Sequence, residues 1–203
     1  METVKYIALE GIDGAGKSTQ VALLSAWLTR RFLTPVTLCE PSYGRYGLEI
    51  RKRLVDGETL TREEQIRLFT LDRKEHVENK IRPLLAFMDR SPGFAIVQDR
   101  CYLSAPAYQA EGESAMIELL RSQQAIAPKP DIVFLIDAPV EVALQRIAKS
   151  GKRPVLFENP ETLEQVRRNY LYLAEEGSER IEVVDGNAPS ELVCARIVET
   201  LSK

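Results

Sequence analysis

Residues 11–18 read Gly11-Ile12-Asp13-Gly14-Ala15-Gly16-Lys17-Ser18. This run fits the pattern G-x-x-x-x-G-K-[S/T], and it lies between an apolar segment at 4–9 and an amphipathic one at 18–32. Glycines let the backbone curl so that several N–H groups point at one anion, and the following helix adds the positive end of its dipole. The stretch therefore predicts a phosphate-binding loop in which Lys17 reaches the terminal phosphates of a nucleotide and Ser18 ligates Mg²⁺. The alternative, an ordinary glycine-rich turn, leaves Lys17, Ser18 and Thr19 unexplained.

Short apolar runs alternate with helical patterns along the rest of the chain. The runs expected to form strands are Val4–Leu9, Val36–Cys39, Phe94–Gln98, Ile132–Ile136 and Ile181–Val184. Unbroken apolar strands separated by helices are typical of a parallel sheet that is covered on both faces. The sequence therefore predicts an α/β protein with the three-layer α/β/α fold of P-loop NTPases, a five-stranded parallel sheet with helices on both faces, and a short lid at about 146–160. No linker or repeat interrupts the pattern, so we expect a single domain over 1–203.

Composition narrows the class of protein. Of the 203 residues, 44% are hydrophobic and 28% are charged, which is typical of a chain with a sizeable core. The net charge is −3, so no overall basic field attracts nucleic acid or a membrane, and we expect neither as a partner. We also expect no signal peptide and no membrane span. The only histidine argues against a zinc site, and three scattered cysteines (Cys39, Cys101 and Cys194) favour reduced thiols and a cytoplasmic location.

Charged side chains gather where the predicted strands end, which is where ligands bind in a parallel sheet. They are Glu40 with Arg51 further along, Asp99-Arg100, Asp137, and the four cations Arg146, Lys149, Lys152 and Arg153. Phosphoryl transfer brings two phosphates together, and one pair of unit charges at about 4 Å costs about 4 kcal/mol at an effective dielectric of about 20. Mg²⁺ and several cations must offset that repulsion, and arginine binds phosphate oxygens in pairs. Singly, each of these charges also fits a solvated surface; together with the loop, they favour a kinase.

Longer segments match a known family. They are Leu9–Gln20, Glu40-Pro41, Leu68-Phe69 with Arg73 and His76, Asp99-Arg100 with Ser104 and Ala107-Tyr108-Gln109, and Pro130-Asp131 leading to Asp137. In these segments the chain resembles the thymidylate kinase family of P-loop nucleoside monophosphate kinases. The resemblance runs from residue 4 to about residue 172, and the segments occur in the same order as in the family. The loop alone is shared by a whole superfamily. The patterns Leu-Phe-x-x-x-Arg and Asp-Arg-x-x-x-Ser-x-x-Ala-Tyr-Gln are specific to this family.

The resemblance implies transfer of the γ-phosphate of ATP to dTMP in dTTP synthesis, with Mg²⁺ as cofactor and a homodimer as the assembly. For ATP it implies the loop residues Gly11, Ile12, Asp13, Gly14, Ala15, Gly16, Lys17, Ser18 and Thr19, and for the metal it implies Ser18 and Asp99. The residues implied in catalysis are Lys17, Asp99, Arg100, Arg146 and Arg153.

The resemblance also implies an acceptor site for dTMP, and its residues are Asp13, Glu40, Arg51, Phe69, Arg73, Arg100, Tyr108 and Gln109. Phe69 stacks on the thymine, Arg73 donates to a thymine carbonyl, and Gln109 completes the reading of the base edge. Asp13 accepts from the sugar 3′-hydroxyl, and Tyr108 crowds the 2′ position. Arg51 and Arg100 hold the phosphate. For Phe69 and Tyr108, packing in the core remains an alternative.

Two departures from the family pattern bear on the mechanism. Some members place an arginine inside the loop, whereas others use lid arginines; Ala15 implies the second arrangement, with Arg153 ahead of Arg146 as the group that stabilises the transition state. The family usually continues Glu-Pro with Gly-Gly-Thr, but here Ser42-Tyr43-Gly44 follows. That loop lies near the acceptor, so another nucleoside monophosphate or a nucleoside remains an alternative substrate.

An alternative of another class is a nucleotide-dependent switch or binding module. The guanine-specific pattern Asn-Lys-x-Asp would support it. Here Asn79-Lys80 is followed by Ile81-Arg82. A switch would hydrolyse ATP whether or not dTMP is present, whereas a kinase requires the acceptor.

Overall fold

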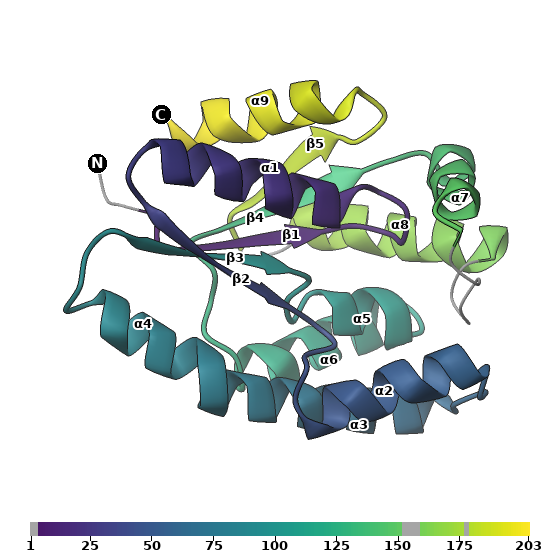
Figure 1. Cartoon of the computed structure of the whole chain (residues 1–203). Coiled ribbons are helices and arrows are strands. Elements are labelled where there is room, and N and C mark those ends of the chain that lie inside the picture. Colours follow the sequence, from purple (N-terminus) through teal and green to yellow (C-terminus); the bar gives the residue numbers. More distant parts are fainter. Residues whose placement is uncertain (1–3, 152–158, 177–178) are drawn as a thin grey trace.

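Five parallel strands form the centre of the molecule (Figure 1). The computed structural model describes residues 4–151, 159–176 and 179–203. The strands are β1 (Tyr6–Glu10), β2 (Thr34–Cys39), β3 (Phe94–Asp99), β4 (Ile132–Asp137) and β5 (Ile181–Asp185), and they lie in the order β2-β3-β1-β4-β5. Each neighbouring pair is parallel. The five strands predicted from the apolar runs are confirmed, and their bounds differ from the prediction by at most two residues.

The apolar runs are continuous because the middle of the sheet is buried on both faces. In the central strand β1 every residue is buried, and in β4 all but the last are buried. A strand that packs on two layers has no solvent side, so it needs no polar alternation. The edge strands β2 and β5 are partly exposed. The glycine-rich loop therefore follows directly from a strand, β1, that is buried along its whole length.

Helices cover both faces of the sheet, which gives the predicted three layers (Figure 1). On one face, α1 (Lys17–Arg30) packs against α9 (Ser190–Leu201). On the other lie α4 (Arg82–Met88), α5 (Ser104–Gln109), α6 (Glu113–Gln124) and α8 (Pro160–Glu176). Along the described part of the chain, no helix has the length and apolar character that crossing a membrane requires.

The remaining helices lie toward the carboxyl ends of the strands. Beyond β2, α2 (Arg45–Asp56) packs against α3 (Arg62–His76), and a π-helical turn (Val77–Ile81) joins α3 to α4. A capping box fixes the start of α3. The Thr61 side chain accepts a hydrogen bond from the backbone N–H of Glu64, and the Glu64 side chain accepts one from the backbone N–H of Thr61. Beyond β4, α7 (Val140–Lys149) packs against α8. The candidate site is built on these ends.

One expected helix bound needs correction, and part of the expected lid lies outside the described residues. The helix expected over 18–32 ends at Arg30, because the N–H groups of Arg31 and Phe32 turn back to Leu28 and Thr29. Phe32 then takes φ 61 and is 95% exposed, so it does not share the buried face of that helix. Of the lid expected at about 146–160, residues 146–149 are the last turn of α7. Residues 152–158, and with them Arg153, lie outside the described residues.

Candidate active site

The glycine-rich loop joins the end of β1 to the start of α1. Gly11, Gly14 and Gly16 all have positive φ, at 140°, 80° and 107°. A side chain at Gly11 would place its Cβ 2.5 Å from the carbonyl oxygen of Ile136 on β4, so only glycine fits there. The loop therefore curls tightly against the neighbouring strand, with the first turn of α1 at its end. A glycine-rich loop that curls at the start of a helix can direct several backbone N–H groups at one anion.

Lys17 is the buried cation of this loop. Its Nζ donates to the carbonyl oxygens of Gly11 (3.0 Å) and Ile12 (2.9 Å), and the residue is 6% exposed. Burial lowers the pKa of Lys17, and the nearby positive charge of Arg100 lowers it further. A buried ammonium ion held among backbone carbonyls is poorly solvated, so an incoming phosphate would gain a strong charge interaction with it.

Ser18 and Asp99 supply oxygen ligands at the start of α1. The Ser18 hydroxyl donates to the Asp99 carboxylate at 2.7 Å, which links α1 to the end of β3. Hard oxygen atoms are the ligands that Mg²⁺ prefers, and Mg²⁺ is commonly held by one or two protein groups together with substrate phosphates. Among the described residues, no group of three or more His, Cys, Asp or Glu side chains could hold a metal by itself. The pair therefore fits a magnesium ion that arrives with a nucleotide.

Arg100 lies opposite Lys17 and is held by four side chains. Its Nη2 donates to Asp13 (2.7 Å) and to the hydroxyl of Tyr108 (2.9 Å), while its Nη1 donates to Ser104 and Tyr170, both at 3.2 Å. The backbone of Arg100 has φ 69, an uncommon conformation for a residue with a side chain. Such strain persists where the surroundings fix the residue, and it is frequent at functional sites.

Asp13 is the anionic partner of Arg100. Burial by itself would raise the pKa of Asp13, but the charges of Arg100 and Lys17 outweigh it and lower the value to about 2. Asp13 is therefore ionised at neutral pH. It also accepts a hydrogen bond from the Tyr108 hydroxyl at 3.0 Å.

We expect this depressed pKa to make folding stability depend on acid pH. A carboxyl whose pKa is lower in the folded state stabilises the fold above its unfolded value of about 3.9 and loses that contribution as pH falls toward about 2. Wild-type protein should lose about 1 kcal/mol more unfolding free energy than Asp13→Asn between about pH 5 and about pH 3, as measured by urea titration. An identical loss in both proteins would mean that Asp13 is not the source.

Glu10 holds the segment that carries Arg100. This carboxylate is fully buried at the end of β1, and it accepts hydrogen bonds from the N–H of Cys101, the hydroxyl of Ser104 and the hydroxyl of Tyr170, all at 2.8 Å. Sequence reasoning gave no role to Glu10, Ser104 or Tyr170. Glu10 and Ser104 lie within segments that match the family, whereas Tyr170 is distant in sequence and nothing in its spacing points to the site.

Arg51 is fixed on the other side of the site, on α2. It donates to the carbonyl oxygen of Pro41, to that of Ser42 (3.3 Å) and to the sulfur of Cys39 (3.4 Å). Its guanidinium lies 4.6 Å from the centre of the Tyr43 ring, within the range of a cation–π interaction. Arg51 is therefore held by the loop that follows β2.

Glu40 and Arg73 form a buried ion pair between that loop and α3. Arg73 donates from Nε (2.9 Å) and Nη2 (2.7 Å) to one Glu40 oxygen, and His76 lies 3.3 Å from the other. Burial would raise the pKa of Glu40, but Arg73 and His76 lower it overall. Arg73 is 1% exposed and also donates to the carbonyl oxygen of Cys101 at 3.2 Å. Arg73 is thus tied to the segment that carries Arg100.

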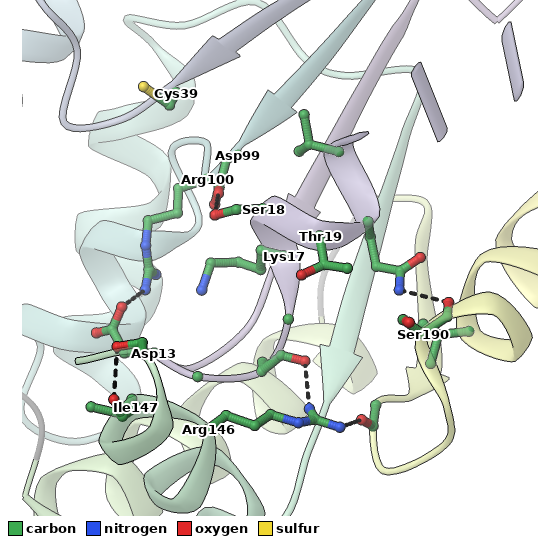
Figure 2. A pocket seen from close by; sticks show the side chains of 18 of the residues that line it. Asp13, Lys17, Ser18, Thr19, Cys39, Asp99, Arg100, Arg146, Ile147 and Ser190 are labelled. Carbon is green, nitrogen blue, oxygen red and sulfur yellow. Dashed lines mark hydrogen bonds and ion pairs between the residues drawn. The ribbon is translucent and has the colours of Figure 1, made fainter. Parts of the chain in front are cut away.

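One large cavity, of about 1210 Å³, opens at the carboxyl ends of the strands. Figure 2 shows the side chains of Lys17 and Arg100 directed into the same space, with Asp13 and Arg146 beside it. Of the residues expected for ATP or dTMP, the cavity lining includes Asp13, Gly14, Ala15, Gly16, Lys17, Ser18, Thr19, Glu40, Arg51 and Arg100, together with Asp99 and Arg146. The described residues that line it do not include Phe69, Arg73, Tyr108 or Gln109.

Those residues are packed against neighbouring side chains. Phe69 packs with Ile50 and Leu68 in a small cluster between α2 and α3. Gln109 is buried, and Tyr108 is in contact with Arg100 and Asp13. The structure therefore brings Lys17, Arg51 and Arg100, which are expected at the phosphates, to one cavity, whereas the residues expected at the base are not part of its described lining.

Arg146 lines the cavity and is held by two backbone carbonyl oxygens. It donates to the carbonyl oxygens of Ala15 (3.1 Å) and Gly186 (2.9 Å), and so joins α7 to the glycine-rich loop and to the turn after β5 (Figure 2). Beside it, Gln20 donates to the carbonyl oxygen of Ser190 at the start of α9. These contacts shape the part of the cavity that is lined by α7, α9 and the turn after β5.

This fold and this site define a P-loop phosphotransferase of the nucleotide kinase class, with a glycine-rich loop, a hydrogen-bonded Ser18–Asp99 pair beside it, and two arginines, Arg51 and Arg100, in the same cavity. The chain belongs to the thymidylate kinase family, because the family model described as thymidylate kinase matches residues 9–197. The resemblance read from the motifs and the predicted fold class are both confirmed.

Several relatives support the same assignment. Over 163 residues the chain is 40% identical to a thymidylate kinase of Desulfotalea psychrophila, with 80% of this chain and 78% of the relative covered. It is 37% identical over 198 residues to a thymidylate kinase of Akkermansia muciniphila, with 98% and 91% covered. It is also 38% identical over 179 residues to a probable thymidylate kinase of Thermococcus kodakarensis, with 84% of each chain covered.

Proposed function

We propose that this protein transfers the γ-phosphoryl group of ATP to dTMP and so supplies dTDP for the synthesis of dTTP. The observation that carries the proposal is that the glycine-rich loop, Arg51 and Arg100 line the same cavity. In that arrangement the loop and Lys17 hold the donor phosphates, and the two arginines hold the acceptor phosphate. Membership of the thymidylate kinase family supports dTMP as the acceptor.

The proposed chemistry is positioning and charge neutralisation. The acceptor is already a phosphate anion, so no protein base is needed. Lys17 on one side and Arg100 on the other offset the charge that builds up between donor and acceptor. Arg100 is held by Asp13, Tyr108, Ser104 and Tyr170, so it loses little freedom when it binds phosphate.

We propose Mg²⁺ as the cofactor, held by Ser18 and Asp99 together with the phosphates of ATP. When bound, Mg²⁺ would neutralise part of the phosphate charge. Asp13 would accept from the sugar 3′-hydroxyl, and Phe69, Arg73, Tyr108 and Gln109 would form the base and sugar side of the acceptor site. Glu40 would support that side through its ion pair with Arg73.

We propose Arg153, followed by Arg146, as the lid cations that stabilise the transition state. Closure of a lid at about 146–160 would exclude water and so limit wasteful hydrolysis of ATP. Arg146 already reaches the glycine-rich loop.

A panel of acceptors tests the proposed function. ADP release is measured with ATP and Mg²⁺ and with dTMP, dUMP, dCMP, dGMP, AMP or thymidine in turn, and kcat/KM is compared. We expect dTMP to give the highest value and turnover to stop when Mg²⁺ is chelated. A different best acceptor would identify another nucleotide kinase. ATP hydrolysis that is independent of any acceptor would instead indicate a nucleotide-dependent switch.

We also propose that residues 1–203 form one domain, that the protein acts in the cytoplasm as a homodimer, and that it has no nucleic acid partner. The homodimer rests on the family resemblance alone, and light scattering at the assay concentration tests it. The free thiols of Cys39, Cys101 and Cys194 support a reducing compartment.

A further inference from the structure

The loop at Ser42-Tyr43-Gly44, which departs from the family pattern, is fastened to α3 by a buried carboxylate. The backbone N–H of Ser42 donates to one oxygen of Asp72 at 2.8 Å, and the Ser42 hydroxyl donates to the other at 2.5 Å. Ser42 is 4% exposed and Asp72 is 1% exposed. A carboxylate that is buried and doubly hydrogen-bonded in this way ties the two segments firmly together.

The same contact extends into the start of α2. The Ser42 hydroxyl also accepts a hydrogen bond from the N–H of Gly44 at 2.9 Å, so both its donor and its acceptor capacity are used. A Cβ at Gly47 would lie 2.7 Å from an Asp72 oxygen, which means that the first turn of α2 packs directly on the pair. The loop, α2 and α3 therefore meet at Ser42 and Asp72.

Arg51 depends on the loop that this pair fixes. Its Nε donates to the carbonyl oxygen of Ser42, the same residue whose N–H and hydroxyl donate to Asp72. It also donates to the carbonyl oxygen of Pro41, and the ring of Tyr43 lies over its guanidinium. Arg51 and Tyr43 both line the cavity, whereas Ser42 and Asp72 do not.

We propose that Ser42 and Asp72 are a positioning pair that sets Arg51 and Tyr43 at the acceptor phosphate. Because Asp72 precedes Arg73 on α3, the pair also fixes the distance between the proposed base side and the proposed phosphate side of the acceptor site. The proposal rests on the function proposed above. It gives a structural role to the hydroxyl at a position where the family usually has glycine.

Ser42→Ala tests the proposal with ATP and dTMP as substrates. Loss of a hydrogen bond to a buried carboxylate should release the loop, and we expect KM for dTMP to rise about tenfold. Arg51 donates to the loop after β2, and within the described part of the chain it makes no hydrogen bond to the glycine-rich loop, so KM for ATP should stay within about twofold of wild type. A purely structural role would lower the melting temperature and leave the ratio of the two KM values unchanged.

Asp72→Asn disturbs the same contact from α3 and should produce the same split between the two KM values. In an Arg51→Ala background, Ser42→Ala should raise KM for dTMP less than it does in the wild type, because one of the two groups that the pair positions is gone. Ser202→Ala is the matched control and should behave as wild type. It removes an exposed hydroxyl that donates to the carbonyl oxygen of Val198 at the end of α9.

The outcomes separate this inference from the proposed function. If the wild-type protein does not phosphorylate dTMP, the proposed function is wrong. If it does, but Ser42→Ala and Asp72→Asn both leave KM for dTMP unchanged, the positioning role is wrong. Equal effects of Ser42→Ala in the wild-type and Arg51→Ala backgrounds would also overturn it.

Discussion

Replacement of Lys17 by alanine is expected to lower kcat by about a thousandfold or more. The ammonium group lies buried against the carbonyl oxygens of Gly11 and Ile12, inside the curl of the loop, where water screens it poorly. No described cation is placed to replace it, because Arg100 and Arg146 are both held by other partners. The measurement is ADP release at saturating ATP and dTMP, with far-UV circular dichroism to check the fold.

Lys5→Ala is the matched control for this variant. Lys5 pairs with Asp89 at the opposite end of β1, so its removal should leave kcat within about twofold of wild type. Retention of more than about a tenth of wild-type kcat in Lys17→Ala would remove the loop lysine from the mechanism.

Replacement of Arg100 by alanine is expected to lower kcat/KM for dTMP by about a thousandfold. The Arg100 guanidinium donates hydrogen bonds to four side chains, those of Asp13, Ser104, Tyr108 and Tyr170. It also lies in the same cavity as Lys17. Its removal takes away the cation proposed to hold the acceptor phosphate and leaves Asp13 without its ion-pair partner. Arg100→Lys should recover only a small part of the loss, because lysine lacks the planar fork that reaches several acceptors. Steady-state kinetics with dTMP varied at saturating ATP measures the effect.

Arg196→Ala is the control for Arg100→Ala. Arg196 also pairs with an aspartate, Asp185, but on the exposed side of α9. We expect its kinetics to match those of the wild type. If Arg100→Ala kept kcat/KM within about tenfold of wild type, the acceptor phosphate would have to bind elsewhere.

Much of the fold could be predicted from the sequence because its signals are local. Each buried strand is an unbroken apolar run, and the glycine positions of the loop are set by backbone geometry at each residue. No helix was predicted over α4 or α5. They are short, and each contains a proline near its start, Pro83 and Pro106, which weakens a helical pattern.

Long-range contacts could not be predicted in the same way. Glu10 accepts from Tyr170, which is 160 residues away along the chain, and Ser42 meets Asp72 across 30 residues. No local spacing encodes such pairs, because they form only when the sheet order and the packing of α3 and α8 bring the segments together. The resemblance to a family pointed to the residues around Arg100, but it gave no role to Glu10, the carboxylate that holds their segment.

The sequence by itself determined the parallel sheet, the phosphate loop and the family, since each rests on residues adjacent in the chain or on fixed motifs. Only the tertiary structure decided how the cations are held. In the folded protein Arg100 forms an ion pair with Asp13. Arg51 donates a hydrogen bond to the loop after β2, and Arg146 donates one to the glycine-rich loop. Buried charges are stable only with partners, and those partners come from distant segments, so the electrostatics of the site are a property of the packed fold.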